Sequence, residues 1–153
     1  MDEHFEDAVV QIVADADVIV AVWRDAPGPE QLEALAKITT KVGRRTSGRC
    51  GLLDVVLGSP PLFVDYQRSA TTRFAQAVAP ARSGIAHVVL ALGPAGVAVR
   101  EFLGGLLMQT RPSTPTRIFE KVTRAADWLA ANLTSTTPQR VLAIVEPMLA
   151  RVM

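Results

Sequence analysis

The side chains that could do chemistry in this chain are few and widely separated. There are two histidines, His4 and His87, and one cysteine, Cys50. A histidine that acts as a general base needs a partner and a pocket, and a nucleophilic cysteine needs a nearby base. His87 lies inside an apolar run, which favours a hydrogen-bonded histidine of the core, and Cys50 is expected to pack as a small apolar group. We therefore expect no catalytic residues and interpret the chain as a non-enzyme.

Asp54 is the one acidic residue inside an apolar run, residues 50–57. Buried carboxylates are usually paired, which favours a structural role in which Asp54 accepts hydrogen bonds from a neighbouring loop or lies at a strand end or edge. A carboxylate of a ligand site is the alternative. His4 belongs to an acidic amino terminus that we expect to be frayed.

Gly93 opens the loop Gly93-Pro94-Ala95-Gly96, which follows an apolar run and precedes a segment with helical spacing. Free backbone N–H groups at such a place can hold an anion. The loop lacks the lysine of a P-loop and the third glycine of a dinucleotide fingerprint, so Gly93 is interpreted as a turn residue, with a phosphate site as the alternative. Histidine, cysteine and acidic residues show neither zinc nor EF-hand spacing, so no metal or cofactor is expected.

Composition limits the class of protein. The 153 residues are 49% hydrophobic and 20% charged, which fits one globular domain. The net charge of +1 is too small to attract nucleic acid electrostatically. The most apolar stretch, residues 84–99, is short and interrupted at Gly93-Pro94, so no membrane span is predicted. A single cysteine, an acidic amino terminus and a strong excess of arginine over lysine favour a cytoplasmic bacterial protein.

Short apolar runs alternate with segments of helical spacing. Runs at 9–14 and Val18–Trp23 are separated by Asp15-Ala16-Asp17, which predicts a hairpin, and further strands are expected at 50–57, 85–92 and 116–119. Helices are expected between and after them, at 29–43, from Asp65 to Pro80, at 99–107 and at 122–133. This order predicts an α/β fold with a mixed, mostly parallel sheet of about five strands and four helices.

The carboxy-terminal residues 134–153 are predicted to form an additional helix after a polar hinge, as an extension of the domain formed by residues 1–133. Its apolar side chains could pack onto the sheet of the same chain. Alternatively, they could pair with a second copy and form a homo-oligomer.

The order of elements resembles that of the STAS/SpoIIAA-like superfamily, in particular its stand-alone bacterial members. The resemblance covers residues 7–133 and rests on the sequences VAVWR at 20–24, RIF at 117–119 and AADWLA at 125–130. It implies a STAS-like fold and a regulator that binds a partner protein, sometimes a small ligand. In the anti-sigma factor antagonists a partner kinase phosphorylates a serine after the central strand. Ser59 falls near that place, although the family's Asp-Ser pattern is absent.

Two functions follow from these features. The first is a regulatory or scaffolding module that docks a protein around residues 58–65, with the carboxy-terminal helix as a second contact face. The second is a binder of a small apolar or anionic ligand in a crevice near Asp54, Ser59 and Gly93, because ligands of open α/β sheets bind at the carboxyl ends of the strands.

Overall fold

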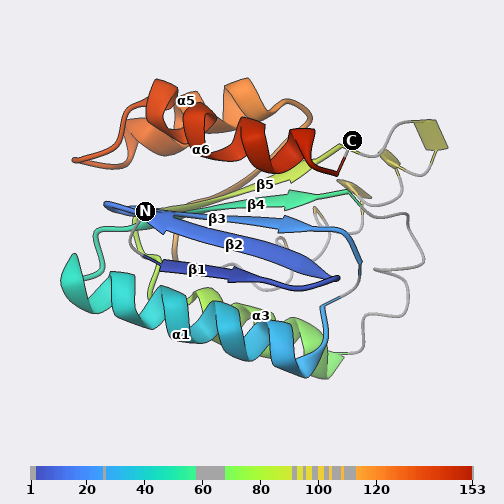
Figure 1. Ribbon diagram of the computed structural model, residues 1–153, viewed down its shortest axis with the longest axis horizontal. Coiled ribbons are helices and arrows are strands. Elements are labelled where there is room, and N and C mark those ends of the chain that lie inside the picture. The colour runs from blue at the N-terminus through green and yellow to red at the C-terminus, as the bar shows by residue number, and fades with distance from the viewer. Residues whose placement is uncertain are drawn as a thin grey trace.

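The chain folds into one six-stranded sheet with helices on both faces, as Figure 1 shows for the computed structural model. The structure describes residues 3–25, 27–57, 68–90 and 113–152, with residues 93, 94, 96, 97, 100, 101, 104 and 108 between them. The strands are β1 (Glu3–Glu6), β2 (Val10–Asp15), β3 (Val18–Trp23), β4 (Gly51–Val56), β5 (Gly84–Val89) and β6 (Thr116–Phe119). The helices with assigned bounds are α1 (Pro29–Arg45), α3 (Arg68–Val78), α5 (Val122–Ala131) and α6 (Pro138–Ala150). The predicted α/β class is confirmed.

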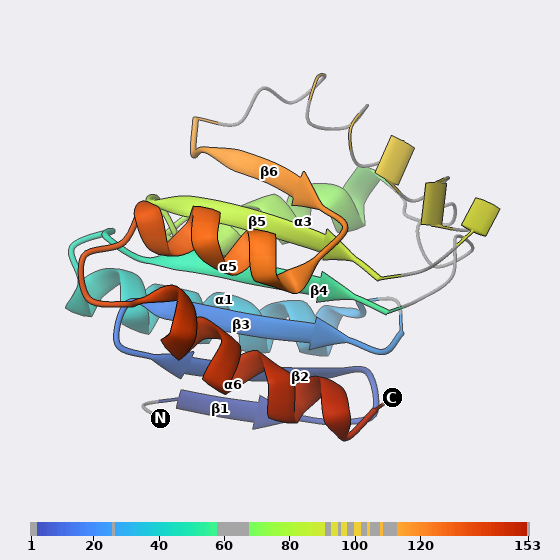
Figure 2. The ribbon, with the colours of Figure 1, turned by 90° about the horizontal axis from the view of Figure 1, so that it is seen from above.

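The strands lie in the sheet in their order along the chain, as seen from above in Figure 2. β1, β2 and β3 are antiparallel neighbours, so the predicted hairpin is present, while β3, β4, β5 and β6 run parallel. The predicted helix at 99–107 falls mostly on residues outside those described. Among the described residues, no helix is long and apolar enough to cross a membrane.

The amino terminus differs from the expectation of a frayed end, because it forms the edge strand β1 and raises the strand count to six. Phe5 packs against the core beneath the sheet. The acidic residues near Phe5 form ion pairs, since Glu3 lies 3.6 Å from Lys41 and Glu6 lies 2.9 Å from Arg24. An acidic segment can therefore form the edge strand of the sheet, where charged side chains also discourage pairing with other chains.

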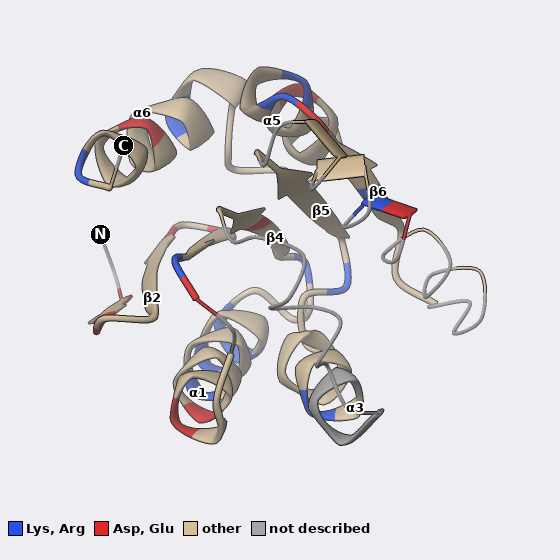
Figure 3. Cartoon of the chain, turned by 90° about the vertical axis from the view of Figure 1, so that its right-hand side faces the viewer, with Lys and Arg blue, Asp and Glu red and all other residues tan. Residues whose placement is uncertain are grey.

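Alternate side chains of the inner strands β2 to β5 enter two separate cores. One core lies between the sheet and the helices α1 and α3, and the other lies between the sheet and α5 and α6 (Figure 3). A strand that is covered on both faces must be apolar throughout, which is why β3 and β4 read as continuous apolar runs. Asp54 is the exception within β4.

The helix α6 packs onto the sheet of its own chain, which is one of the two arrangements left open by the sequence, and the homo-oligomer stays a prediction. Val141, Ile144 and Val145 of α6 are buried in the core shared with α5. The hinge before α6 is tied to the turn between β2 and β3, because Asp17 accepts hydrogen bonds from the N–H groups of Thr134 at 3.2 Å and Ser135 at 2.9 Å.

Candidate functional site

Three polar side chains from neighbouring strands meet beneath α3. The Trp23 indole Nε1 donates to Asp54 Oδ1 at 2.6 Å, and His87 Nδ1 lies 2.8 Å from Asp54 Oδ2. An ionised carboxylate can only accept, so the tautomer of His87 with its proton on Nδ1 is the one that pairs with it. We call Trp23, Asp54 and His87 the polar cluster.

Strand register brings the polar cluster together. Asp54 of β4 lies directly opposite His87 of β5 and Ala21 of β3, and Trp23 follows Ala21 on the same face of β3. Side chains two residues apart share one face of a strand, so all three point toward α1 and α3. The parallel strands thus fix the cluster without help from a loop.

The polar cluster is closed from solvent. Trp23 and Asp54 are each 3% exposed and His87 is 7% exposed. Phe74 of α3 covers them, with its ring centroid 6.5 Å from that of Trp23 and 6.1 Å from that of His87. Each carboxylate oxygen has a donor, which is the condition under which a buried acid is tolerated.

An aspartate that orients a histidine through Nδ1 is the arrangement that prepares Nε2 as a general base. A base also needs a reacting group within hydrogen-bond reach. Cys50 is a poor nucleophile, because burial raises the pKa of its thiol and its Sγ lies 3.4 Å from the Pro80 carbonyl oxygen. The described part of the chain holds no group of three histidine, cysteine or acidic side chains placed to bind a metal. The contacts show directly that side-chain hydrogen bonds link three neighbouring strands.

The predicted site residues have different outcomes. Asp54 is paired, as its structural interpretation predicts, although the donors come from neighbouring strands and not from a loop. Gly93 is exposed and has a φ of +68°, with open space around its Cβ position, so backbone conformation is what favours glycine there. Ser59 and the predicted docking segment 58–65 lie outside the described residues. Asp54 is therefore the one predicted site residue whose contacts the structure defines.

The pairing of Asp54 with His87 and Trp23 is not among the predictions from the sequence. A signal was available, because Asp54 and His87 each lie within an apolar run that was expected to be a buried parallel strand. Two polar residues on the same face of adjacent strands are candidates for mutual pairing. What the sequence does not contain is the register that places them opposite each other.

Comparison of the chain with protein-family models, with curated proteins and with solved structures gives no match. The resemblance to the STAS/SpoIIAA-like superfamily therefore stays a prediction.

Proposed function

We propose that this chain is a non-enzymatic regulatory or scaffolding module that acts by binding another protein. One observation carries the proposal. Among the described residues, two large apolar side chains are exposed, Val97 by 47% and Met108 by 78%, and both belong to the segment between β5 and β6. Large apolar side chains exposed to solvent are candidates for an interaction site, because a partner that covers them removes them from water.

Two further features support binding over catalysis. Both oxygens of the Asp54 carboxylate are engaged inside the protein, and the Cys50 thiol is buried with a raised pKa. The resemblance to STAS-like regulators agrees with a partner protein. A cytoplasmic location belongs to the same proposal, and the use of a single, buried cysteine supports it.

The test is purification of the tagged chain from lysate of its own organism, with partners identified by mass spectrometry, followed by variants at the exposed side chains. We expect Met108→Asp and Val97→Asp to lose the partner, because a charge in an apolar interface is costly. The matched control is Ala131→Asp, at an exposed position on α5. Equal recovery of the partner by all three variants would show that the segment between β5 and β6 is not the binding surface.

Binding of a small ligand at the carboxyl ends of the central strands stays the alternative prediction. Its three residues give it no further support, because Asp54 is engaged with Trp23 and His87, the positive φ of the exposed Gly93 accounts for a glycine there, and Ser59 lies outside the described residues.

A further inference from the structure

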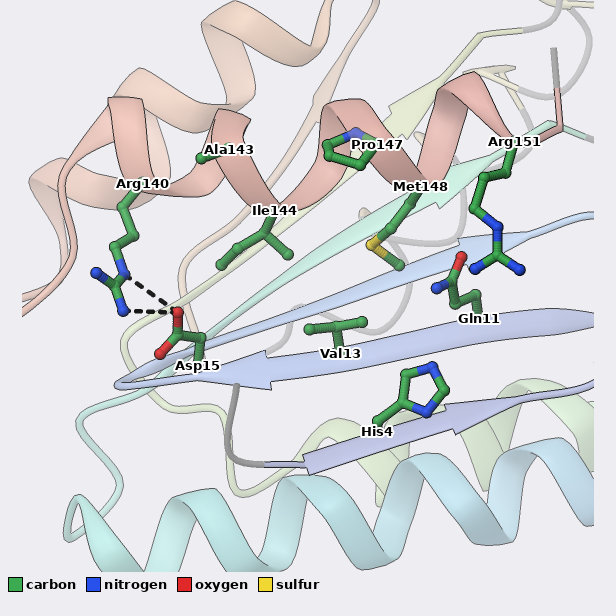
Figure 4. Close-up of a pocket in the computed structure, with 10 residues that line it drawn as sticks. All are labelled: His4, Gln11, Val13, Asp15, Arg140, Ala143, Ile144, Pro147, Met148 and Arg151. Atoms are coloured by element: carbon green, nitrogen blue, oxygen red, sulfur yellow. Dashed lines mark hydrogen bonds and ion pairs between the residues drawn. The ribbon is translucent and has the colours of Figure 1, made fainter.

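A groove of about 480 Å³ lies between α6 and the sheet edge formed by β1 and β2, as the close-up in Figure 4 shows. Gln11 and Val13 of β2 form its floor, Ile144 and Met148 of α6 form its inner wall, and His4 of β1 lies at its outer rim. We call this feature the α6 groove. Its size falls within the range of about 300–1,000 Å³ that small-molecule sites occupy.

Gln11 is the unusual residue of the α6 groove. Its side chain stands up from β2 between Met148 and Arg151 in the view of Figure 4, and the residue is only 5% exposed. Its amide oxygen Oε1 is buried and has no hydrogen-bond partner among the described residues. A buried acceptor without a donor destabilises a protein, and an apolar residue at this place would avoid that cost. A glutamine here therefore points to a donor that comes from outside the chain.

Ion pairs lie at the two ends of the α6 groove. At one end Arg140 lies 2.8 Å from Asp15, and at the other end Arg151 lies 3.3 Å from Glu6. A hydrogen bond from Arg24 lowers the pKa of Glu6, so this carboxylate stays ionised at neutral pH. The arginine at each end already has a carboxylate partner, so a charged ligand would have to displace one member of an ion pair.

We propose that the α6 groove binds a small neutral amphiphile, whose apolar body lies on Val13, Ile144 and Met148 and whose hydroxyl or amide group hydrogen-bonds to Gln11. A hydroxyl or a primary amide both donates and accepts, so it pairs with the glutamine amide in either of its two orientations. This site is separate from the segment that carries the proposed protein binding, so either proposal can fail without the other.

The test compares three eight-carbon probes that differ only in the head group: 1-octanol, octanoate and octylammonium. Each is titrated into the labelled protein while backbone amide shifts are followed by NMR. We expect saturable shifts for octanol that centre on β2 and α6, with weaker binding of both charged probes. Tighter binding of octanoate or octylammonium would overturn the proposal, because the charged groups at the ends would then be the anchors. Absence of saturable shifts with octanol would overturn it as well.

Variants assign the binding to Gln11 and to the groove. Gln11→Leu should weaken octanol binding about tenfold, which corresponds to one hydrogen bond. Ala143→Phe, on the exposed wall of the groove, should abolish binding by filling it, whereas Gln139→Leu on the exposed side of α6 should change nothing. Unchanged octanol affinity in Gln11→Leu would show that the amide needs only water and would overturn the proposal.

Discussion

At the scale of residues, substitution of Asp54 tests whether the polar cluster stabilises the fold or serves a function. The Asp54→Ala variant leaves Trp23 Nε1 and His87 Nδ1 buried without their acceptor. A buried donor left without its acceptor costs about 1–3 kcal/mol, so the loss of the acceptor for two donors is a large share of the stability of a domain. We expect a loss of unfolding free energy of that size in urea titrations.

The matched control for this prediction is Asp127→Ala, because Asp127 is exposed on α5. Substitutions at such positions usually change stability by no more than about 0.5 kcal/mol. A smaller loss is expected for Asp54→Asn, since its amide oxygen still accepts from Trp23. If Asp54→Ala proves as stable as the control, the buried carboxylate does not stabilise the fold, and a functional reason for it gains weight.

At the scale of elements, the anchor of α6 is the carboxylate of Asp17. It accepts from the N–H groups of Thr134 and Ser135 and from the Thr136 hydroxyl, and it is 3% exposed. Asp17→Ala leaves the buried Thr136 hydroxyl and two partly buried N–H groups without their acceptor, and a buried donor without a partner costs about 1–3 kcal/mol. We expect the unfolding free energy to fall by about 2–4 kcal/mol, and hydrogen exchange of α6 amides to accelerate more than that of α1 amides.

A nearby acid provides the control for the anchor. Asp15→Ala breaks the ion pair with Arg140 at the start of α6, but the Arg140 side chain is 55% exposed. Ion pairs of this kind contribute about 0–1 kcal/mol. Equal losses in Asp15→Ala and Asp17→Ala, or uniform exchange over all helices, would mean that α6 is held by its apolar face and not by this anchor.

The elements that the sequence predicts correctly are those with a local signal. The run Val18–Trp23 has the predicted bounds, and the helix expected at 29–43 is α1, Pro29–Arg45. β1 was missed because its stability depends on pairing with β2 and on distant cations at Lys41 and Arg24. The direct pairing of Asp54 with His87 depends on register. The hydrogen bonds of Asp17 to Thr134 and Ser135 join residues that are 117 and 118 positions apart. Such long-range contacts leave no periodic pattern in the sequence.

At the scale of the whole molecule, two cores share one sheet, and each core contains one tryptophan. Trp23 lies in the core beneath α1 and α3. Trp128 packs with Phe119 on the opposite face, with ring centroids 5.7 Å apart. The two faces are not independent, because β3 and β4 contribute alternate side chains to both cores. A strand that loses its register on one face also loses it on the other.

This coupling predicts a single cooperative unfolding transition, as is usual for one small domain. In Trp128→Phe the fluorescence reports Trp23, and in Trp23→Phe it reports Trp128. Within each variant, the midpoint from fluorescence in urea should coincide with the midpoint from far-ultraviolet circular dichroism. The comparison is made inside each variant because Trp23→Phe also removes the hydrogen bond to Asp54 and lowers stability overall. In one variant the fluorescence midpoint could fall at a lower urea concentration than the circular dichroism midpoint. This would show that the helices over the remaining tryptophan detach first, and that the shared strands do not couple the two cores.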